Sequence, residues 1–440
     1  MADEPLPGEP EGKPFSFLKG VEDVLAERIG KSLTWDQRAA KVREHLTDAM
    51  NARHVAFLFG SGCSSYVTKK VEFGIPTMAT MAEGFAKAIG VTRDGNAVTA
   101  DEHAYLRQYF GIDITATKYQ KNLEALMEVL LSLHFVARTS EMESLNKGTL
   151  GVVESIIKKV TTYILITCTQ GLFSWADDSV ANLYQSFYRK LIYRDRSLPR
   201  PWIFTTNYDL FNETAMDRLS VPYSNGFSGT VERRFNPANF RYSLGEQLDI
   251  SNRKWTVADS FVYLCKLHGS INWVEDIKGL FPIRELQTPS SDRGRVMIYP
   301  TPAKQAASLG SPYTDLFREF QSRIVRDQSV LFVLGYSFSD EHVNNIIFQA
   351  LTVPTFRMIA FVSPDSSGVP EQLRNLGDRR IWMIGGAGPS SERKAHYFDT
   401  FVEHFMPEPP GDKVDKAIGK VLDTLLKAST NQEPDDHAGG

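Results

Sequence analysis

Short apolar runs that end abruptly in polar residues recur along this chain, and four of them share one design. In each, hydrophobic residues give way to a cluster of Gly, Ser, Thr, Asn, Asp or His. A buried parallel strand delivers polar side chains to the carboxyl edge of a sheet in this way. The four pairs of run and polar end are 55–59 with 60–65, 202–204 with 205–209, 262–267 with 268–270, and 330–334 with 335–340. The pattern predicts that four strand ends meet at one nucleotide-handling site.

Further apolar runs and helical stripes surround these four. Strands are expected at about 296–299, 358–362 and 381–384, with helices between them. A helix is expected to begin after Ser32 or Thr34, either of which is a suitable cap, and to run to about Leu46. Because strands alternate with helices, the chain is predicted to be an α/β protein with a doubly wound parallel sheet.

A long helical insertion is predicted at about 78–198, between the first strand and the strand that starts near Pro201. Its apolar positions, including those of 123–130 and 152–166, fall at helical spacing. These stripes and His134 fit a helix core better than a cofactor site. Residues 222–255 show no periodicity and are expected to form a surface excursion near the site, acting as a lid.

The two ends of the chain differ from the middle. Residues 1–30 are expected to be disordered, because the first fourteen are rich in proline and acids. A catalytic domain is expected at 31–405. The prolines at 407–410 break the pattern, and apolar positions in 414–425 then predict an amphipathic helix within a terminal segment, 406–440. That helix would either pack back on the domain or dock on another chain.

Composition excludes several classes of function. The net charge of −4 gives no global field for nucleic acid or anionic lipid, and the basic residues at 189–200 fit a solvated helix face. There is no basic-then-apolar leader and no run long enough to span a membrane, so a cytoplasmic location is expected. The three cysteines are far apart and form no Cys-x-x-Cys pair, which argues against structural zinc and against disulfides. Cys63 is expected to be a small packed residue rather than a nucleophile.

The polar strand ends offer groups suited to ribose chemistry. Asn207 would orient a hydroxyl or a water, and His268 would accept its proton near neutral pH. Asp209 would offset positive charge as an N-glycosidic bond breaks through an oxocarbenium-like state. Each residue also has a purely structural explanation, since Asn207 and Asp209 suit a helix cap and His268 suits a hydrogen-bonded core. The four segments together favour the catalytic interpretation.

The glycine turn after the first strand is a weak signal on its own. Its backbone N–H groups suit a diphosphate at a helix start, but it lacks the full dinucleotide spacing and no acid waits about twenty positions on. Together with Gly74-Ile-Pro76, the turn resembles the glycine loop and Gly-Ile-Pro element of sirtuin-type NAD-binding domains. Thr206-Asn-Tyr-Asp209 is similar to their Thr-x-Asn-x-Asp motif, Leu267-His-Gly269 to their His-Gly, and Gly335-Tyr-Ser337 to their Gly-x-Ser.

The resemblance implies a Rossmann-like domain that binds NAD as substrate, without a metal. The positions that it implies for NAD binding are Gly60, Ser61, Gly62, Ser64, Ser65, Pro76, Thr206, Gly335, Ser337 and Asp340. Two departures from deacylating sirtuins are visible. Their four zinc cysteines are missing, so no zinc module is expected, and Thr77-Met-Ala79 replaces the residues that line their nicotinamide pocket.

The exact residues of these motifs resemble those of the bacterial sirtuin-like NAD hydrolases of antiphage defence more than those of the deacylases. The implied reaction is cleavage of NAD to nicotinamide and ADP-ribose, with water as acceptor. A protein deacylase or ADP-ribosyltransferase remains an alternative, as does a non-catalytic nucleotide sensor or scaffold. Relatives of this length resemble the subunit that assembles with a HerA-type hexameric ATPase, so such a partner and a homo-oligomer are expected. No direct contact with nucleic acid or membrane is expected.

Overall fold

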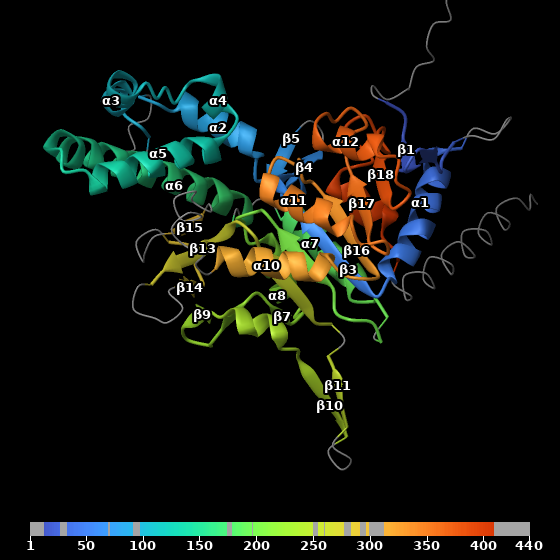
Figure 1. Ribbon diagram of the computed structural model, residues 1–440. Coiled ribbons are helices and arrows are strands. Elements are labelled where there is room, and N and C mark those ends of the chain that lie inside the picture. Colours follow the sequence, from blue (N-terminus) through green and yellow to red (C-terminus); the bar gives the residue numbers. More distant parts are fainter. Residues whose placement is uncertain are drawn as a thin grey trace, which may run out of the picture.

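A computed structural model describes residues 13–26, 33–68, 71–90, 97–173, 178–195, 197–249, 254–258, 260–276, 283–290, 296–298 and 312–408. A large twisted sheet lies at the centre of these residues, and a group of helices projects from one side of it (Figure 1). The C-terminal helix expected at 414–425 lies outside the described residues.

Six strands form the parallel core of the central sheet, and their order confirms the predicted doubly wound fold. Across the sheet they are β12 (Val262–Lys266), β6 (Trp202–Thr205), β3 (His54–Phe59), β16 (Ser329–Leu334), β17 (Arg357–Phe361) and β18 (Ile381–Gly385). Numbered along the chain, this order is 3-2-1-4-5-6, the arrangement of dinucleotide-binding sheets. The order reverses between β3 and β16, so the carboxyl ends of these two strands mark the expected ligand crevice.

Side chains alternate between two apolar cores because successive residues of a strand point to opposite faces. Phe57 and Phe59 of β3 join the core on one face, whereas Ala56 and Leu58 join the core on the other. The first face is covered by α1 (Trp35–Met50), α7 (Ser179–Leu191) and α8 (Phe211–Arg218). The second is covered by α10 (Tyr313–Ile324), α11 (Glu341–Ala350) and α12 (Val369–Asn375). Helix α1 begins at the predicted cap, since the Thr34 hydroxyl accepts from the Gln37 N–H.

The N-terminal segment corrects one prediction. Disorder was expected through residue 30, but β1 (Ser16–Lys19) pairs antiparallel with β18 and turns back into β2 (Glu22–Asp23). Phe17 is fully buried, and its ring packs edge-on against Trp382 at 5.4 Å between centroids. Its burial and the ladder hydrogen bonds to β18 offset the entropy that the proline-rich composition would otherwise retain.

The helical insertion stands beside the sheet, at the upper left of Figure 1. Its elements are α2 (Met78–Lys87), α3 (Ala100–Phe110), α4 (Thr117–Gln120), α5 (Leu123–Thr139), the π-helical turn η2 (Ser144–Thr149) and α6 (Leu150–Phe173). Helix α7 was expected to belong to it but packs on the sheet instead, where Phe187 meets Phe57 at 5.2 Å between ring centroids. The insertion therefore ends before α7.

A second, antiparallel sheet contains two short strands from the segment expected to be a lid. Its order is β15 (Val296–Ile298), β13 (Gly269–Glu275), β14 (Ile283–Glu285), β9 (Arg233–Phe235) and β8 (Phe227–Ser228). A hairpin of β10 (Gly245–Asp249) and β11 (Lys254–Val257) projects at the bottom of Figure 1. The predicted strand at 296–299 thus exists but pairs here, antiparallel to β13, rather than in the main sheet. The other strands of this second sheet were not predicted, because their residues show no clear alternation of hydrophobic and polar positions.

The remaining elements are short. They are the 3₁₀ turn η1 (Ser61–Cys63), β4 (Ser65–Thr68), β5 (Val71–Gly74), β7 (Tyr223–Ser224), the 3₁₀ turn η3 (Pro237–Arg241), α13 (Phe398–Thr400) and the π-helical turn η4 (Phe401–Phe405). None of the helices in the described ranges combines the length and the apolar character that crossing a bilayer requires.

Candidate active site

The glycine turn after β3 lies directly against the turn after β16. The Gly62 N–H donates to the Gly335 carbonyl at 2.9 Å, and the Gly60 N–H donates to the Leu334 carbonyl at 2.9 Å. Gly335 has a φ of +60°, and a Cβ added to it would lie 2.6 Å from the backbone nitrogen of Cys63. Only glycine meets both conditions at this position. The two turns therefore touch through their backbones where the strand order reverses.

A cavity of about 580 Å³ opens above these turns. It brings together Asn207, Asp209 and His268, which come from two different strand ends. Of the positions implied to bind NAD, those that line the cavity are Ser61, Gly62, Ser64, Pro76, Thr206, Gly335, Ser337 and Asp340. Gly60 and Ser65 do not line it. Gly60 instead packs against Gly335, where an added Cβ would lie 2.4 Å from the carbonyl oxygen, and Ser65 begins β4.

The amide of Asn207 ties its own loop to the glycine turn. Its Nδ2 donates to the Gly60 carbonyl and to Ser64 Oγ, both at 2.8 Å. Ser64 Oγ donates in turn to Asp209 Oδ2 at 2.5 Å, and Asp209 Oδ1 accepts from the Phe211 N–H at the start of α8. Asp209 thus has the helix-start role considered from the sequence and also faces the cavity. The Nδ2 of Asn207 is engaged, so its carbonyl oxygen is the group left for a ligand.

His268 lies in the tight turn between β12 and β13, and its side chain is 7% exposed. Its Nε2 is 2.6 Å from Asp340 Oδ2, and its Nδ1 is 3.8 Å from Glu124 Oε1. Asp340 also caps α11, where its Oδ1 accepts from the His342 and Val343 N–H groups. Because these bonds occupy both oxygens of Asp340, that residue positions His268 more than it offers a free contact to a nucleotide.

The charge on His268 depends on these neighbours. Burial disfavours the imidazolium, but the hydrogen bond to Asp340 and the charges of Glu124 and Asp340 outweigh burial, so the pKa of His268 is raised. Burial alone would raise the pKa of Asp340, but the hydrogen bond from His268 lowers it. A proton on Nε2 shared with Asp340 leaves Nδ1 as the acceptor that can take a proton from a ligand.

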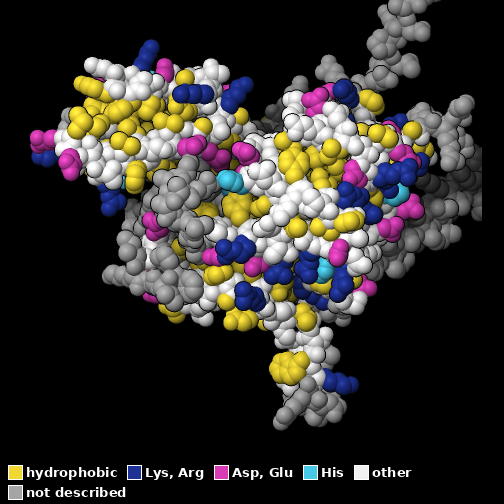
Figure 2. Space-filling view, in the orientation of Figure 1, with side chains coloured by type: hydrophobic (Ala, Val, Ile, Leu, Met, Phe, Trp, Pro, Cys, Tyr) yellow, Lys and Arg dark blue, Asp and Glu magenta, His cyan; other side chains and the backbone are white. Residues whose placement is uncertain are grey.

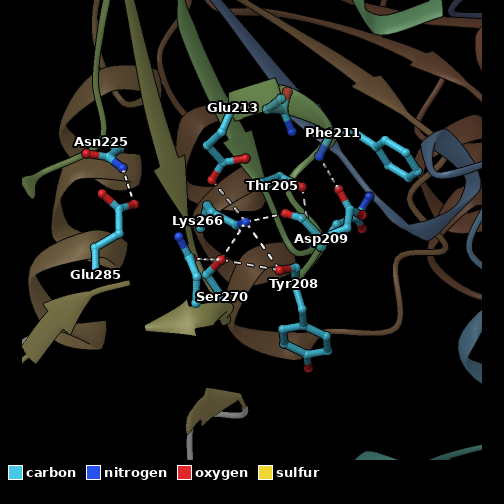
Figure 3. A network of polar contacts seen from close by, with 12 residues as sticks. Thr205, Tyr208, Asp209, Phe211, Glu213, Asn225, Lys266, Ser270 and Glu285 are labelled. Carbon is cyan, nitrogen blue, oxygen red and sulfur yellow. Dashed lines mark hydrogen bonds and ion pairs between the residues drawn. The ribbon is translucent and has the colours of Figure 1, made fainter. Parts of the chain in front are cut away.

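A buried lysine that was not singled out from the sequence lies beneath the loops that carry Asn207, Asp209 and His268 (Figure 3). Lys266 Nζ donates to the backbone carbonyls of Tyr208 and Asp209, to Ser270 Oγ at 2.8 Å and to Glu213 Oε1 at 3.1 Å. Its side chain is 1% exposed. It thereby joins the loop that carries Asn207 to the turn that carries His268. Burial raises the pKa of Glu213 to about 7, against the opposing charge of Lys266.

The helical insertion supplies one wall of the cavity, and the sequence did not show which of its residues would do so. Residues 75–79 and Met81 line it from α2 and the segment before it, and Lys121, Asn122 and Glu124 line it from the start of α5. Glu124 Oε1 also accepts from the Tyr208 hydroxyl at 2.6 Å. Among the described residues of 222–255, none lines the cavity, so the lid expected there is not found in this part of the chain. Nothing in the sequence indicated a role for Glu124, because it is a single acid on an amphipathic helix.

Two further side chains bear on the chemistry of the cavity. Cys63 is fully buried, and burial raises the pKa of its thiol well above the usual range, which fits the expected packing role. Across the described ranges, no three His, Cys, Asp or Glu side chains are grouped to hold a metal ion.

Fold and cavity together define a doubly wound α/β protein with a carboxylate-bearing pocket at the crevice where the strand order reverses. Residues 201–381 match the family model of the SIR2-like domain. This range carries Asn207, Asp209, His268 and Asp340, but not the glycine turn. A solved mutant of a Sir2 homologue in complex with ADP-ribose is 12% identical, with 77% of this chain and 95% of that chain covered at a TM-score of 0.29. No curated protein matches the sequence.

Proposed function

We propose that this chain hydrolyses NAD to nicotinamide and ADP-ribose. The proposal is carried by one observation: the amide of Asn207, the carboxylate of Asp209 and the Asp340-bound imidazole of His268 line a single cavity. That cavity lies over the glycine turns at the point where the strand order reverses. The match of residues 201–381 to the SIR2-like domain supports NAD as the substrate.

The reaction would begin with the bond between the nicotinamide nitrogen and ribose C1′. As it breaks, its electron pair goes to the nicotinamide ring, which loses its positive charge, and an oxocarbenium-like sugar forms. Asp209, 3% exposed, would offset the developing charge. A water oriented by the Asn207 carbonyl oxygen would attack C1′, and its proton would pass to His268 Nδ1. NAD and water thus give nicotinamide, ADP-ribose and one proton.

The first experiment follows nicotinamide and ADP-ribose by chromatography after the purified chain is incubated with NAD. We expect Asn207→Ala and His268→Ala to lower the rate by at least about 100-fold, since each removes a group that acts on the reacting atoms. His134→Ala is the matched control, because His134 is partly exposed and contacts Glu154 on the insertion. Cleavage that survives in Asn207→Ala would contradict the assignment.

The same assay separates the alternatives. Turnover that requires an acetylated peptide would favour a deacylase, although the sequence lacks the four zinc cysteines. Transfer of ADP-ribose to protein would favour a transferase. Binding of NAD without turnover under every condition would favour a nucleotide sensor or scaffold.

We propose further that NAD depletion by this chain serves antiphage defence, as a homo-oligomer in complex with a HerA-type hexameric ATPase. The proposal rests on the resemblance of the motifs at 205–209, 267–271 and 335–342 to those of defence hydrolases. The cleavage assay repeated with and without the ATPase, alongside size measurement of each mixture, tests it. A mixture in which the two proteins stay separate and turnover is unchanged would refute the partnership.

A further inference from the structure

A second cavity lies at the opposite edge of the central sheet. It has a volume of about 470 Å³ and is lined by the starts of β3 and β6, by the end of α10 and by the base of the β10–β11 hairpin. Strands β3, β6 and β16 run from this edge to the candidate active site. The two cavities share no lining residue. We call it the basic cavity, after His54, Arg200, Arg323 and Arg326 in its wall.

Basic side chains outnumber acidic ones among the described residues of this wall. Among the described residues that line the basic cavity there is no Asp or Glu. Arg323 is paired with Glu319, but Arg326 in the wall and Arg53 beside it make no ion pair within the described ranges. Lys and Arg side chains gather on this face, above the base of the β10–β11 hairpin (Figure 2).

Neighbouring acids offset part of this positive charge. Glu319 is engaged by Arg323, whose Nε and Nη2 both donate to its Oε2. Asp195 accepts from the backbone and hydroxyl of Ser197, and Asp327 accepts from the Thr355 hydroxyl. Close by, Arg194 donates to four main-chain carbonyls, those of Met50, Ala52, Arg53 and Pro199, so it adds positive charge without an acid partner in these bonds.

Burial and the same positive charges lower the pKa values of two groups around the wall. Burial, followed by the charges of Arg326, Arg53, Arg194 and Arg323, lowers the pKa of His54 to about 4. Burial and the charge of Arg200 lower the pKa of Arg194 to about 10. Like charges held this close destabilise the folded chain. Clusters that cost stability in this way are typical of binding sites.

The shape of the cavity limits what would fill it. Trp202 is 7% exposed, and its ring has two close neighbours. The Tyr263 ring stacks on it at 4.3 Å between centroids, and the Arg323 guanidinium lies 4.3 Å from its centroid. This packing holds Arg323 in place. Uncharged surface from Leu198, Pro199 and Val257 completes the wall. Arg323 is already paired with Glu319, so the ligand would share Arg323 and bind Arg326 directly. A phosphate group suits this arrangement better than a single carboxylate, because it offers three acceptor oxygens to the two guanidinium groups.

We propose that the basic cavity binds a small phosphorylated molecule, with its phosphate on Arg323 and Arg326 and its uncharged part against Leu198, Pro199 and Val257. Neutral His54 and the hydroxyls of the wall add hydrogen bonds. This site is separate from the one that would hold NAD, and it does not depend on the chain being an NAD hydrolase.

Inorganic pyrophosphate is the probe for the first test, because it carries the charge without an organic part. We expect saturable binding that slows amide hydrogen exchange at 54–57, 197–202 and 323–328. Arg326→Ala and Arg323→Ala should each weaken binding about tenfold or more, since each removes a charged hydrogen bond. Arg318→Ala, on the exposed side of the same helix, should leave it unchanged.

Three results would overturn the proposal. They are protection confined to the glycine turns at 60–65 and 335–340, equal affinity in Arg326→Ala, and no saturable binding at all. If a duplex oligonucleotide binds in an Arg326-dependent manner and pyrophosphate does not, the ligand of the basic cavity is nucleic acid rather than a small phosphorylated molecule, and the proposal is wrong.

Stability provides a second, independent test. If Arg326 serves only the fold, Arg326→Ala should lower the unfolding midpoint. If it is held against repulsion for a ligand, the midpoint should stay or rise while pyrophosphate affinity falls. His54→Glu places an acid in the wall and should stabilise the free chain while abolishing binding. Loss of both stability and affinity in the two variants would contradict the proposal.

Discussion

Replacing Lys266 by methionine tests how the buried network positions the candidate catalytic loops. The substitution keeps the length of the side chain but removes the ammonium that binds the Asp209 carbonyl and Glu213 Oε1. No other hydrogen bond reaches the Asp209 carbonyl in the described part of the chain, so losing it costs about 1–3 kcal/mol. Breaking a buried pair by removing one partner costs about 3–5 kcal/mol in all, which is the loss of unfolding free energy that we expect.

The loss should depend on pH. The pKa of Glu213 is raised from 4.5 to about 7 in the folded chain, so its contribution to stability is present below pH 4.5 and lost as pH rises through 7. Without Lys266 this pKa rises further, because both contributions from Lys266 lower it. The variant should therefore keep losing stability above pH 7, at up to about 1.4 kcal/mol per pH unit, where the wild type has levelled off.

The assay is urea unfolding of Lys266→Met, Glu213→Gln and the double variant, with Lys87→Met on the exposed side of α2 as control. The double variant should lose less than the sum of the single variants, since it leaves no unpaired buried charge. NAD cleavage should fall by about 100-fold in kcat with little change in KM, because a misplaced Asn207 affects the reacting atoms more than binding. A Lys266→Met chain as stable and as active as Lys87→Met would refute this reasoning.

Three further predictions concern single positions. Asp340→Asn keeps the cap on α11 but removes the charge that raises the pKa of His268, so the acid limb of the pH–rate profile should move to lower pH. The same variant should lose stability mainly below pH 6.5, with the loss fading above the raised pKa of the wild type; a fixed limb and a pH-independent loss would contradict this. Gly335→Ala should destabilise by about 2–4 kcal/mol from left-handed strain plus overlap, whereas Gly111→Ala, at φ +64° with no atom within 4 Å, should show the strain alone in the same unfolding assay. Cys63 should resist iodoacetamide until the chain is unfolded in urea, as peptide mass mapping would reveal.

The parallel sheet was readable from the sequence because its signal is local. Runs such as 330–334 are apolar on both faces and end in glycine, and that combination predicts a buried parallel strand without reference to the rest of the chain. The convergence of Asn207 and His268 followed from it, since the carboxyl ends of parallel strands lie at one edge.

What the sequence missed depends on distant partners. Lys266 looked like one polar residue in a strand, and only the fold brings Glu213 and two carbonyls to its ammonium. Glu124 reaches His268 from an insertion whose orientation no local pattern encodes. β1 was missed because its stability comes from pairing with β18, more than 350 positions along the chain.

The contact between the two glycine turns has a consequence for anyone who wishes to redesign this pocket. Backbone atoms of Gly62 and Gly335 abut, and Asn207 is bonded to Gly60, so the base of the pocket behaves as one stiff piece. Bulkier residues at these glycines would clash with the neighbouring backbone rather than change the shape of the pocket. The opposing wall, at 77–79 and at 121–122, is where substitutions could change which molecules enter the pocket without disturbing its base.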